Sequence, residues 1–221
     1  MFRGKRLDSG TLVSALVITG LIFFSGFFIG YGLNTEKLSA VETEMASVTR
    51  DIQNFQLQFL LFDMLGEKAA CPLLSSTLSE INTRSDGIAK RLENVNADSE
   101  VMDYQGYAEL KKEYSRVLLG YWLLANKFKE ACDSKISTVV YFYAKGCDTC
   151  GDQSFVLTYL KRRHEENLLV FALDTDLDEP GIKTIKEYYN VSAYPTLVVN
   201  GVVMEGFQNT DTLEAKIGAT A

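Results

Sequence analysis

The cysteine pair Cys147 and Cys150 stands between a strand-like apolar run at residues 139–144 and a run with helical periodicity. Two cysteines three residues apart at a helix start can close a disulfide, and the first sulfur lies where unpaired backbone N–H groups and the helix dipole stabilise a thiolate. The same spacing is half of a structural zinc site, which needs four ligands, but the sequence has no second closely spaced pair of cysteine or histidine residues. The spacing therefore favours thiol–disulfide chemistry at a strand–helix junction, with no metal and no other cofactor.

A second feature is the uncharged stretch at residues 11–33, which is about 23 residues long and thus long enough to cross a bilayer as a helix. A cleaved signal peptide has a shorter apolar centre and a small-x-small cleavage site, which this stretch lacks. Basic residues precede the stretch and acidic residues predominate after it. We predict a single-pass cell-membrane protein, with residues 1–10 in the cytoplasm, a transmembrane helix at 11–33 and the remaining domains outside the cytoplasm.

Residues 36–134 are predicted to form an antiparallel three-helix bundle. Apolar residues recur there with alternating spacings of three and four, which is typical of long amphipathic helices. The recurrence falls in blocks at residues 38–62, 74–95 and 107–131, separated by short turn-like segments. Helices joined by short loops pack antiparallel. We expect these positions to form the internal core of the bundle, separate from a second core in the C-terminal region.

The bundle also indicates how the two remaining cysteines pair. Four cysteines allow three pairings, and disulfides persist outside the cytoplasm. The antiparallel arrangement places Cys71 and Cys132 at the same end of the bundle, so we predict a structural disulfide between them. An alternative is that this pair relays electrons with Cys147 and Cys150, because the C-terminal domain begins directly after Cys132.

Residues 136–221 alternate strand-like and helix-like segments around the cysteine pair. The expected order is a strand at 138–143, a helix to about residue 163, a strand at 168–174, a helix at 182–189, a two-stranded hairpin turning at 200–201, and a last helix. This order resembles the thioredoxin superfamily, and the residues that carry the resemblance are Phe142-Tyr143-Ala144, Cys147, Cys150, Asp174, Tyr189-Asn190-Val191, Tyr194-Pro195-Thr196, Asn200-Gly201 and Gly206. The resemblance implies an α/β thioredoxin-like C-terminal domain, preceded by the transmembrane helix and the three-helix bundle.

The resemblance also implies roles for individual residues. Cys147 would be the nucleophile and Cys150 the resolving cysteine, while Pro195 would follow a cis peptide bond and the backbone of Tyr194 would pair with an extended substrate. The chain departs from thioredoxin in having Gly146 in place of the usual tryptophan. Tyr141 stands where family members have a buried acid that moves protons, and the lysine partner of that acid would fall near Val170.

The predicted function is a membrane-anchored, extracytoplasmic thiol–disulfide oxidoreductase that acts on protein thiols and disulfides. A net charge of −7 gives no basic surface for nucleic acid. A membrane redox partner and a homodimer are partner hypotheses, the latter because Gly26 and Gly30 form a GxxxG match. The alternative function is a membrane-tethered interaction module with a thioredoxin-fold scaffold and no turnover. The sequence leaves the direction of exchange open.

Overall fold

The computed structural model describes residues 71–97 and 104–218 continuously, helical residues 16–26, and isolated positions at 10, 14 and between 46 and 64. The chain divides into two compact units, residues 1–44 and residues 45–221, and each is described by itself.

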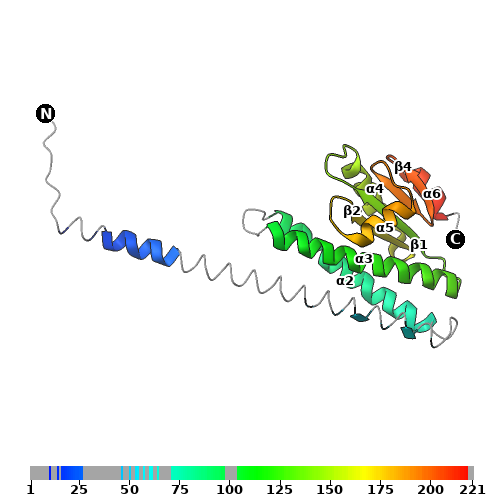
Figure 1. Ribbon diagram of the computed structural model, residues 1–221, viewed down its shortest axis with the longest axis horizontal. Helices are drawn as coiled ribbons and strands as arrows, with labels where there is room; N and C mark the ends of the chain where they lie inside the picture. The colour runs from blue at the N-terminus through cyan, green and yellow to red at the C-terminus, as the bar shows by residue number, and fades with distance from the viewer. Residues whose placement is uncertain are drawn as a thin grey trace. The chain divides into compact units, whose positions relative to one another are not determined.

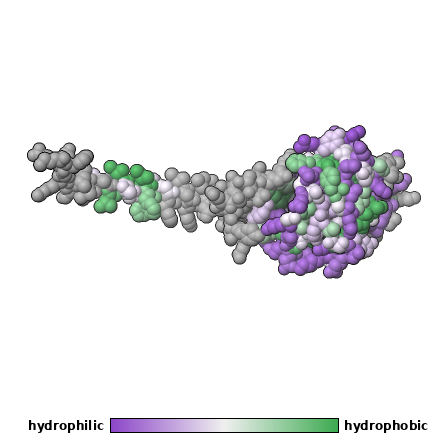
Figure 2. All heavy atoms as spheres, turned by 90° about the horizontal axis from the view of Figure 1, so that it is seen from above, coloured by the Kyte–Doolittle hydropathy of each residue, from purple (hydrophilic) through white to green (hydrophobic). Residues whose placement is uncertain are grey.

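In the first unit, residues 16–26 are helical and their large apolar side chains are exposed. Figure 2 shows hydrophobic spheres gathered over this segment. The polar Ser25 is satisfied within the helix, because its hydroxyl donates to the Ile22 carbonyl at 2.9 Å. Among the helices that the structure describes, none is both long and apolar enough to cross a membrane. The predicted span at 11–33 extends beyond the described helix and stays a prediction.

The second unit contains an antiparallel helical hairpin made of α2 (Cys71–Ala97) and α3 (Tyr104–Cys132), seen side by side in Figure 1. The first residue of α2 is bonded to the last residue of α3, and midway along the pair the Tyr114 hydroxyl donates to the Ser85 carbonyl at 3.4 Å. Most of the first predicted helix, at residues 38–62, lies outside the described residues. The structure therefore shows the second and third predicted helices as a hairpin, and the three-helix bundle stays a prediction.

The hairpin is followed by a four-stranded sheet with the order β2-β1-β3-β4. The strands are β1 (Ser137–Tyr143), β2 (Leu168–Asp174), β3 (Thr196–Val199) and β4 (Val202–Glu205). β1 pairs in parallel with β2 and antiparallel with β3, and β4 is antiparallel to β3. Because β1 is central and covered on both faces, nearly every one of its residues is buried, which explains why apolar and aromatic residues follow one another from Val139 to Tyr143.

Helices cover both faces of this sheet (Figure 1). The remaining helices are α4 (Cys150–His164), the 3₁₀ turn at Glu165–Asn167, α5 (Pro180–Tyr188) and α6 (Thr210–Gly218). One face packs against α4 and α6 through a cluster that includes Val139, Leu160 and Leu213. The opposite face packs against α3 and α5.

The sequence predicted a separate core for the helical bundle, but in the part of the chain that the structure describes, α2 and α3 share one core with the sheet. Buried residues of α2 and α3, such as Leu78 and Leu124, belong to the same cluster as Phe142 and Phe171 of the sheet. The helix α3 thus packs on α2 with one face and on the sheet with another. The apolar pattern of a helix shows which of its faces are buried but not which element covers them.

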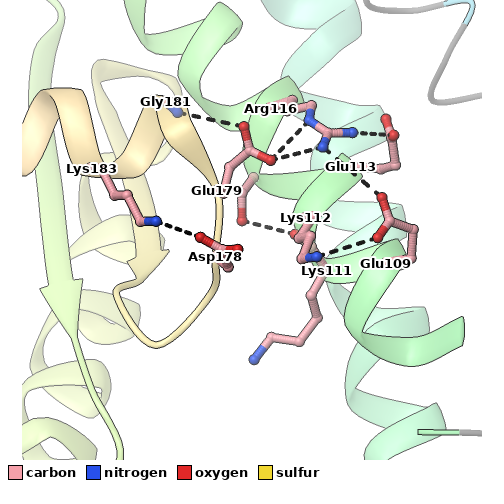
Figure 3. Close-up of polar contacts among 10 residues, drawn as sticks. Glu109, Lys111, Lys112, Glu113, Arg116, Asp178, Glu179, Gly181 and Lys183 are labelled. Carbon is pink, nitrogen blue, oxygen red and sulfur yellow. Dashed lines mark hydrogen bonds and ion pairs between the residues drawn. The ribbon is translucent and has the colours of Figure 1, made fainter. Parts of the chain in front are cut away.

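Ion pairs attach α3 to the segment that joins β2 to α5 (Figure 3). The Arg116 guanidinium donates to the buried Glu179 carboxylate at 2.8 and 3.0 Å, and this hydrogen bond is the main reason that the pKa of Arg116 is raised. Glu179 also accepts from the Gly181 amide at the start of α5, and Lys111 pairs with Asp174 at the end of β2. The buried carboxylate is therefore compensated by a charged partner and a backbone donor.

Candidate active site

The sulfurs of Cys147 and Cys150 are joined, with an S–S distance of 2.04 Å, at the point where α4 begins. The two cysteines differ in exposure, because Cys150 is 8% exposed and Cys147 is half-buried. The accessible end of this disulfide is therefore Cys147. As a separate point, no group of three or more His, Cys, Asp or Glu side chains in the described part of the chain is placed to hold a metal ion.

The segment before the pair is held by the loop that follows β2. The Tyr143 carbonyl accepts from the Thr175 amide at 2.9 Å and from the Thr175 hydroxyl at 3.0 Å. The Lys145 amide donates to the Asp176 carboxylate at 2.5 Å. Gly146 has a φ of +75°, a conformation that other residues rarely adopt, and this explains the glycine directly before Cys147. The loop residues Thr175 and Asp176 thus fix the backbone on which Cys147 is presented.

The predicted substrate-binding residues are joined to the disulfide through an apolar cluster on which Tyr194 packs. The Tyr194–Pro195 peptide bond is cis, and Pro195 is buried. Tyr194 is half-buried and packs against the same apolar cluster as Cys147 and Cys150. The Gly206 amide, just after β4, donates to the Pro195 carbonyl at 2.8 Å and ties the proline segment to the next loop.

Tyr141 occupies the place where the resemblance implies a buried acid. It is 4% exposed, and its hydroxyl donates to the Cys150 carbonyl at 2.6 Å. Burial raises the pKa of Tyr141 to about 12, so the phenol is neutral at pH 7 and acts as a hydrogen-bond donor. Val170 lies on the adjacent strand in a half-buried position. At the place of the implied acid, Tyr141 makes an uncharged contact with the backbone of the buried cysteine.

The Tyr141 contact gives a prediction for stability and its pH dependence. Replacing Tyr141 with phenylalanine removes one buried hydrogen bond and should lower the free energy of unfolding at pH 7 by about 1 kcal/mol. The folded-state pKa of about 12 exceeds the ordinary value of 10.0, so the stabilisation is complete below pH 10 and is lost as the pH rises to 12. Urea unfolding at several pH values should show a shallower alkaline decline in the variant than in the wild type. Equal declines in the two proteins would contradict the assignment.

Sequence reasoning missed Gln153, which is fully buried one turn after Cys150. The buried stripe of α4 consists of Cys150, Gln153, Leu157 and Leu160, so a polar residue stands where the helical period requires an apolar one. A polar residue within this apolar pattern was the sequence feature that could have identified Gln153. The Gln153 side-chain oxygen accepts from the Gln208 amide at 2.7 Å, and its nitrogen donates to the Gln208 carbonyl at 3.3 Å.

The other cysteine pair lies elsewhere in the fold. Cys71 and Cys132 are bonded to each other, with Cα atoms 5.7 Å apart, which is the pairing that the antiparallel helices predict. Cys132 packs against the cluster on the α3 face of the sheet, whereas Cys147 packs against the cluster on the α4 face. The structure does not bring the two disulfides into one cluster.

A sheet covered on both faces by helices, with a disulfide at the start of α4 and a cis-proline segment whose Tyr194 packs on the same apolar cluster, defines a thioredoxin-like dithiol–disulfide domain. Residues 121–219 match the family described as Thioredoxin, and the C-terminal domain is a member of the thioredoxin superfamily. The matched region begins within α3, in agreement with the packing of this helix on the sheet.

Three solved structures illustrate this similarity. A malarial protein is 21% identical, with 38% of this chain and 97% of that chain covered and a TM-score of 0.34. Chloroplastic thioredoxin z is 17% identical, with coverages of 43% and 88% and a TM-score of 0.35. A thioredoxin-like protein from Clostridium perfringens is 20% identical, with coverages of 41% and 75% and a TM-score of 0.35. No curated protein matches the chain.

Proposed function

We propose that the chain is a thiol–disulfide oxidoreductase in which Cys147 exchanges with protein substrates and Cys150 resolves the mixed disulfide. The observation that carries this proposal is the unequal exposure of the two bonded sulfurs, since only Cys147 lies within reach of a partner. The buried Cys150 is then the leaving group when the disulfide opens.

Exchange proceeds by two displacements at sulfur. A substrate thiolate attacks the Cys147 sulfur, the bond to Cys150 breaks, and Cys150 leaves as a thiolate. A second substrate thiolate then attacks the substrate sulfur of the mixed disulfide and releases the Cys147 thiolate. Two electrons have passed from the substrate to the pair, and the reverse sequence reduces a substrate disulfide. The start of α4 stabilises the Cys147 thiolate, while Asp148 opposes it by its negative charge.

The segment at Tyr194 and Pro195 is proposed as the place where an extended substrate lies. Tyr194 is partly exposed and packs with the cluster that contains Cys147. A substrate backbone beside Tyr194 would be close to the accessible sulfur. Protein thiols and disulfides are accordingly the substrate class that we propose, since thioredoxin-like proteins act on them.

The proposed location is a membrane surface. Residues 11–33 would form a single span with the N-terminus in the cytoplasm, and the redox domain would act outside it. The exposed apolar side chains of residues 16–26 and the basic residues before them support this proposal. A membrane redox partner would recycle the cysteine pair, and Gly26 and Gly30 would permit a dimer within the membrane.

A second candidate is a membrane-tethered interaction module without turnover. The observation that favours it is that Tyr141 stands in place of a carboxylic acid, since burial raises the pKa of Tyr141 and its phenol, already protonated at neutral pH, cannot accept a proton. In that case the disulfide of Cys147 and Cys150 would only stabilise a binding scaffold.

The two functions predict different reduction potentials for the Cys147–Cys150 pair. The full-length chain in detergent is equilibrated with glutathione buffers, its thiols are trapped, and the two disulfides are distinguished by peptide mass. A reversible couple between about −120 and −270 mV is expected for an exchanger, and its value gives the favoured direction. A pair that stays oxidised below about −300 mV would behave as a structural disulfide and would favour the scaffold.

A further inference from the structure

A fully buried polar side chain lies in the first turn of α4, the helix that begins at Cys150. Gln153 is 0% exposed and lies between Cys150 and Leu157 on the buried stripe of α4. An amide in such a place is unfavourable unless both its oxygen and its nitrogen are bonded. A methionine or leucine would satisfy the packing of this position without that requirement, so packing alone does not explain a glutamine.

Both polar atoms of Gln153 bond to the backbone of a single residue in the loop between β4 and α6. The side-chain oxygen accepts from the Gln208 amide at 2.7 Å and the side-chain nitrogen donates to the Gln208 carbonyl at 3.3 Å. The Gln153 side chain thus pairs with the Gln208 backbone through one donor and one acceptor, as the backbone of a neighbouring β-strand would. The side chain of Gln208 in turn donates to the carbonyls of Glu205 and Gly206, at 3.0 and 3.2 Å, so the loop is held from both ends.

The same loop is bonded to the proline segment of the site. The Gly206 amide donates to the Pro195 carbonyl at 2.8 Å, and Gly206 has a φ of +76°. Gln153 is therefore linked to Pro195 through Gln208 and Gly206. On its other side, Gln153 is on the same helix as Cys150, one turn away, and its own amide bonds to the Thr149 carbonyl at 3.0 Å.

We propose that Gln153 is a positioning residue that fixes the loop at residues 206–208 and the Pro195 segment relative to the cysteine pair, and so sets the affinity for extended protein substrates. The inference rests on the proposed exchange function. Gln153 is buried and does not touch the substrate, so it acts through the loop. Phe207 stands between the two bonded residues of this loop and is 45% exposed, so loosening of the loop would change the surface that the loop presents.

The first test replaces Gln153 with methionine, which has a similar length and no amide. Turnover of insulin by the full-length chain is measured together with backbone hydrogen exchange of the 206–208 loop in the oxidised protein. We expect the KM for insulin to rise about fivefold, with a much smaller change in kcat, and the loop amides to exchange faster. An unchanged KM with an unchanged exchange rate would overturn the proposal.

The second test uses Gln153→Glu and has a readout that a loss of stability alone would not give. A protonated glutamic acid can accept from the Gln208 amide and donate to the Gln208 carbonyl, whereas the ionised form cannot donate. Burial raises the pKa of such a carboxyl. The KM relative to wild type should therefore be near unity at about pH 5 and approach that of Gln153→Met at about pH 8. A ratio that does not change with pH would contradict the proposal.

A matched control separates positioning from general destabilisation. Ile217, on α6, packs in the apolar cluster that contains Cys150 and Leu160. Ile217→Val should lower the melting temperature without raising the KM. A raised KM in this control would assign the effect to stability and overturn the proposal. If the wild-type chain does not turn over insulin, the exchange function fails, and hydrogen exchange of the loop alone decides whether Gln153 holds it.

Discussion

Replacing Cys147 with serine is expected to abolish thiol–disulfide exchange by the full-length chain, with a loss of at least about 10³-fold in the rate of insulin reduction. The reason is that Cys147 is the accessible member of the pair, while Cys150 is 8% exposed and is the first residue of α4. A hydroxyl neither forms a mixed disulfide nor leaves as a stable anion. Rates are measured with a reductant in excess, and the folded state is checked by circular dichroism.

The complementary variant distinguishes the roles of the two cysteines. With Cys150→Ser, the Cys147 sulfur still attacks a substrate disulfide, but no internal thiol resolves the mixed product. We expect a covalent complex with substrate that is visible on a non-reducing gel and disappears on reduction. The double variant should form none. If Cys150→Ser fails to capture substrate while Cys147→Ser captures it, the assigned roles are reversed.

The strands and helices of the C-terminal domain were predictable because their patterns are local. The structure places β2 at Leu168–Asp174, where the apolar run predicted it, and the hairpin turns at Asn200 and Gly201, both with positive φ. The spacing of Cys147 and Cys150 likewise located their disulfide. The pairing of Cys71 with Cys132 followed from the antiparallel helices, since the first residue of α2 and the last residue of α3 lie at the same end of the hairpin.

What the sequence did not reveal depends on contacts between distant segments. The apolar pattern of α3 fits a separate bundle as well as it fits a helix that covers the sheet, and the choice is made by Phe142 and Phe171, which α3 covers. Gln153 appeared only as a polar residue in an apolar stripe. Its partner, Gln208, lies 55 residues away. The groups that Gln208 offers belong to the backbone, so the identity of its side chain does not indicate the contact.

The second large effect is expected at the other disulfide. Replacing both Cys71 and Cys132 with serine should lower the free energy of unfolding by about 4 kcal/mol, because the bond closes a loop of about sixty residues and restricts the unfolded chain. The α3 helix belongs to both the hairpin and the core of the sheet, so the loss should appear in the single transition of the second unit. Urea unfolding monitored by circular dichroism measures it.

The same double variant tests whether the second disulfide relays electrons. Cys132 packs on the α3 face of the sheet and Cys147 on the α4 face, so a direct exchange between the pairs would require a large rearrangement of the domain. We therefore expect the double variant to turn over insulin at the wild-type rate at temperatures well below its unfolding transition. A variant that stays folded but loses exchange would establish the relay. A variant that keeps wild-type stability would show that the bond constrains little of the unfolded chain, because the loop-closure entropy would then be missing.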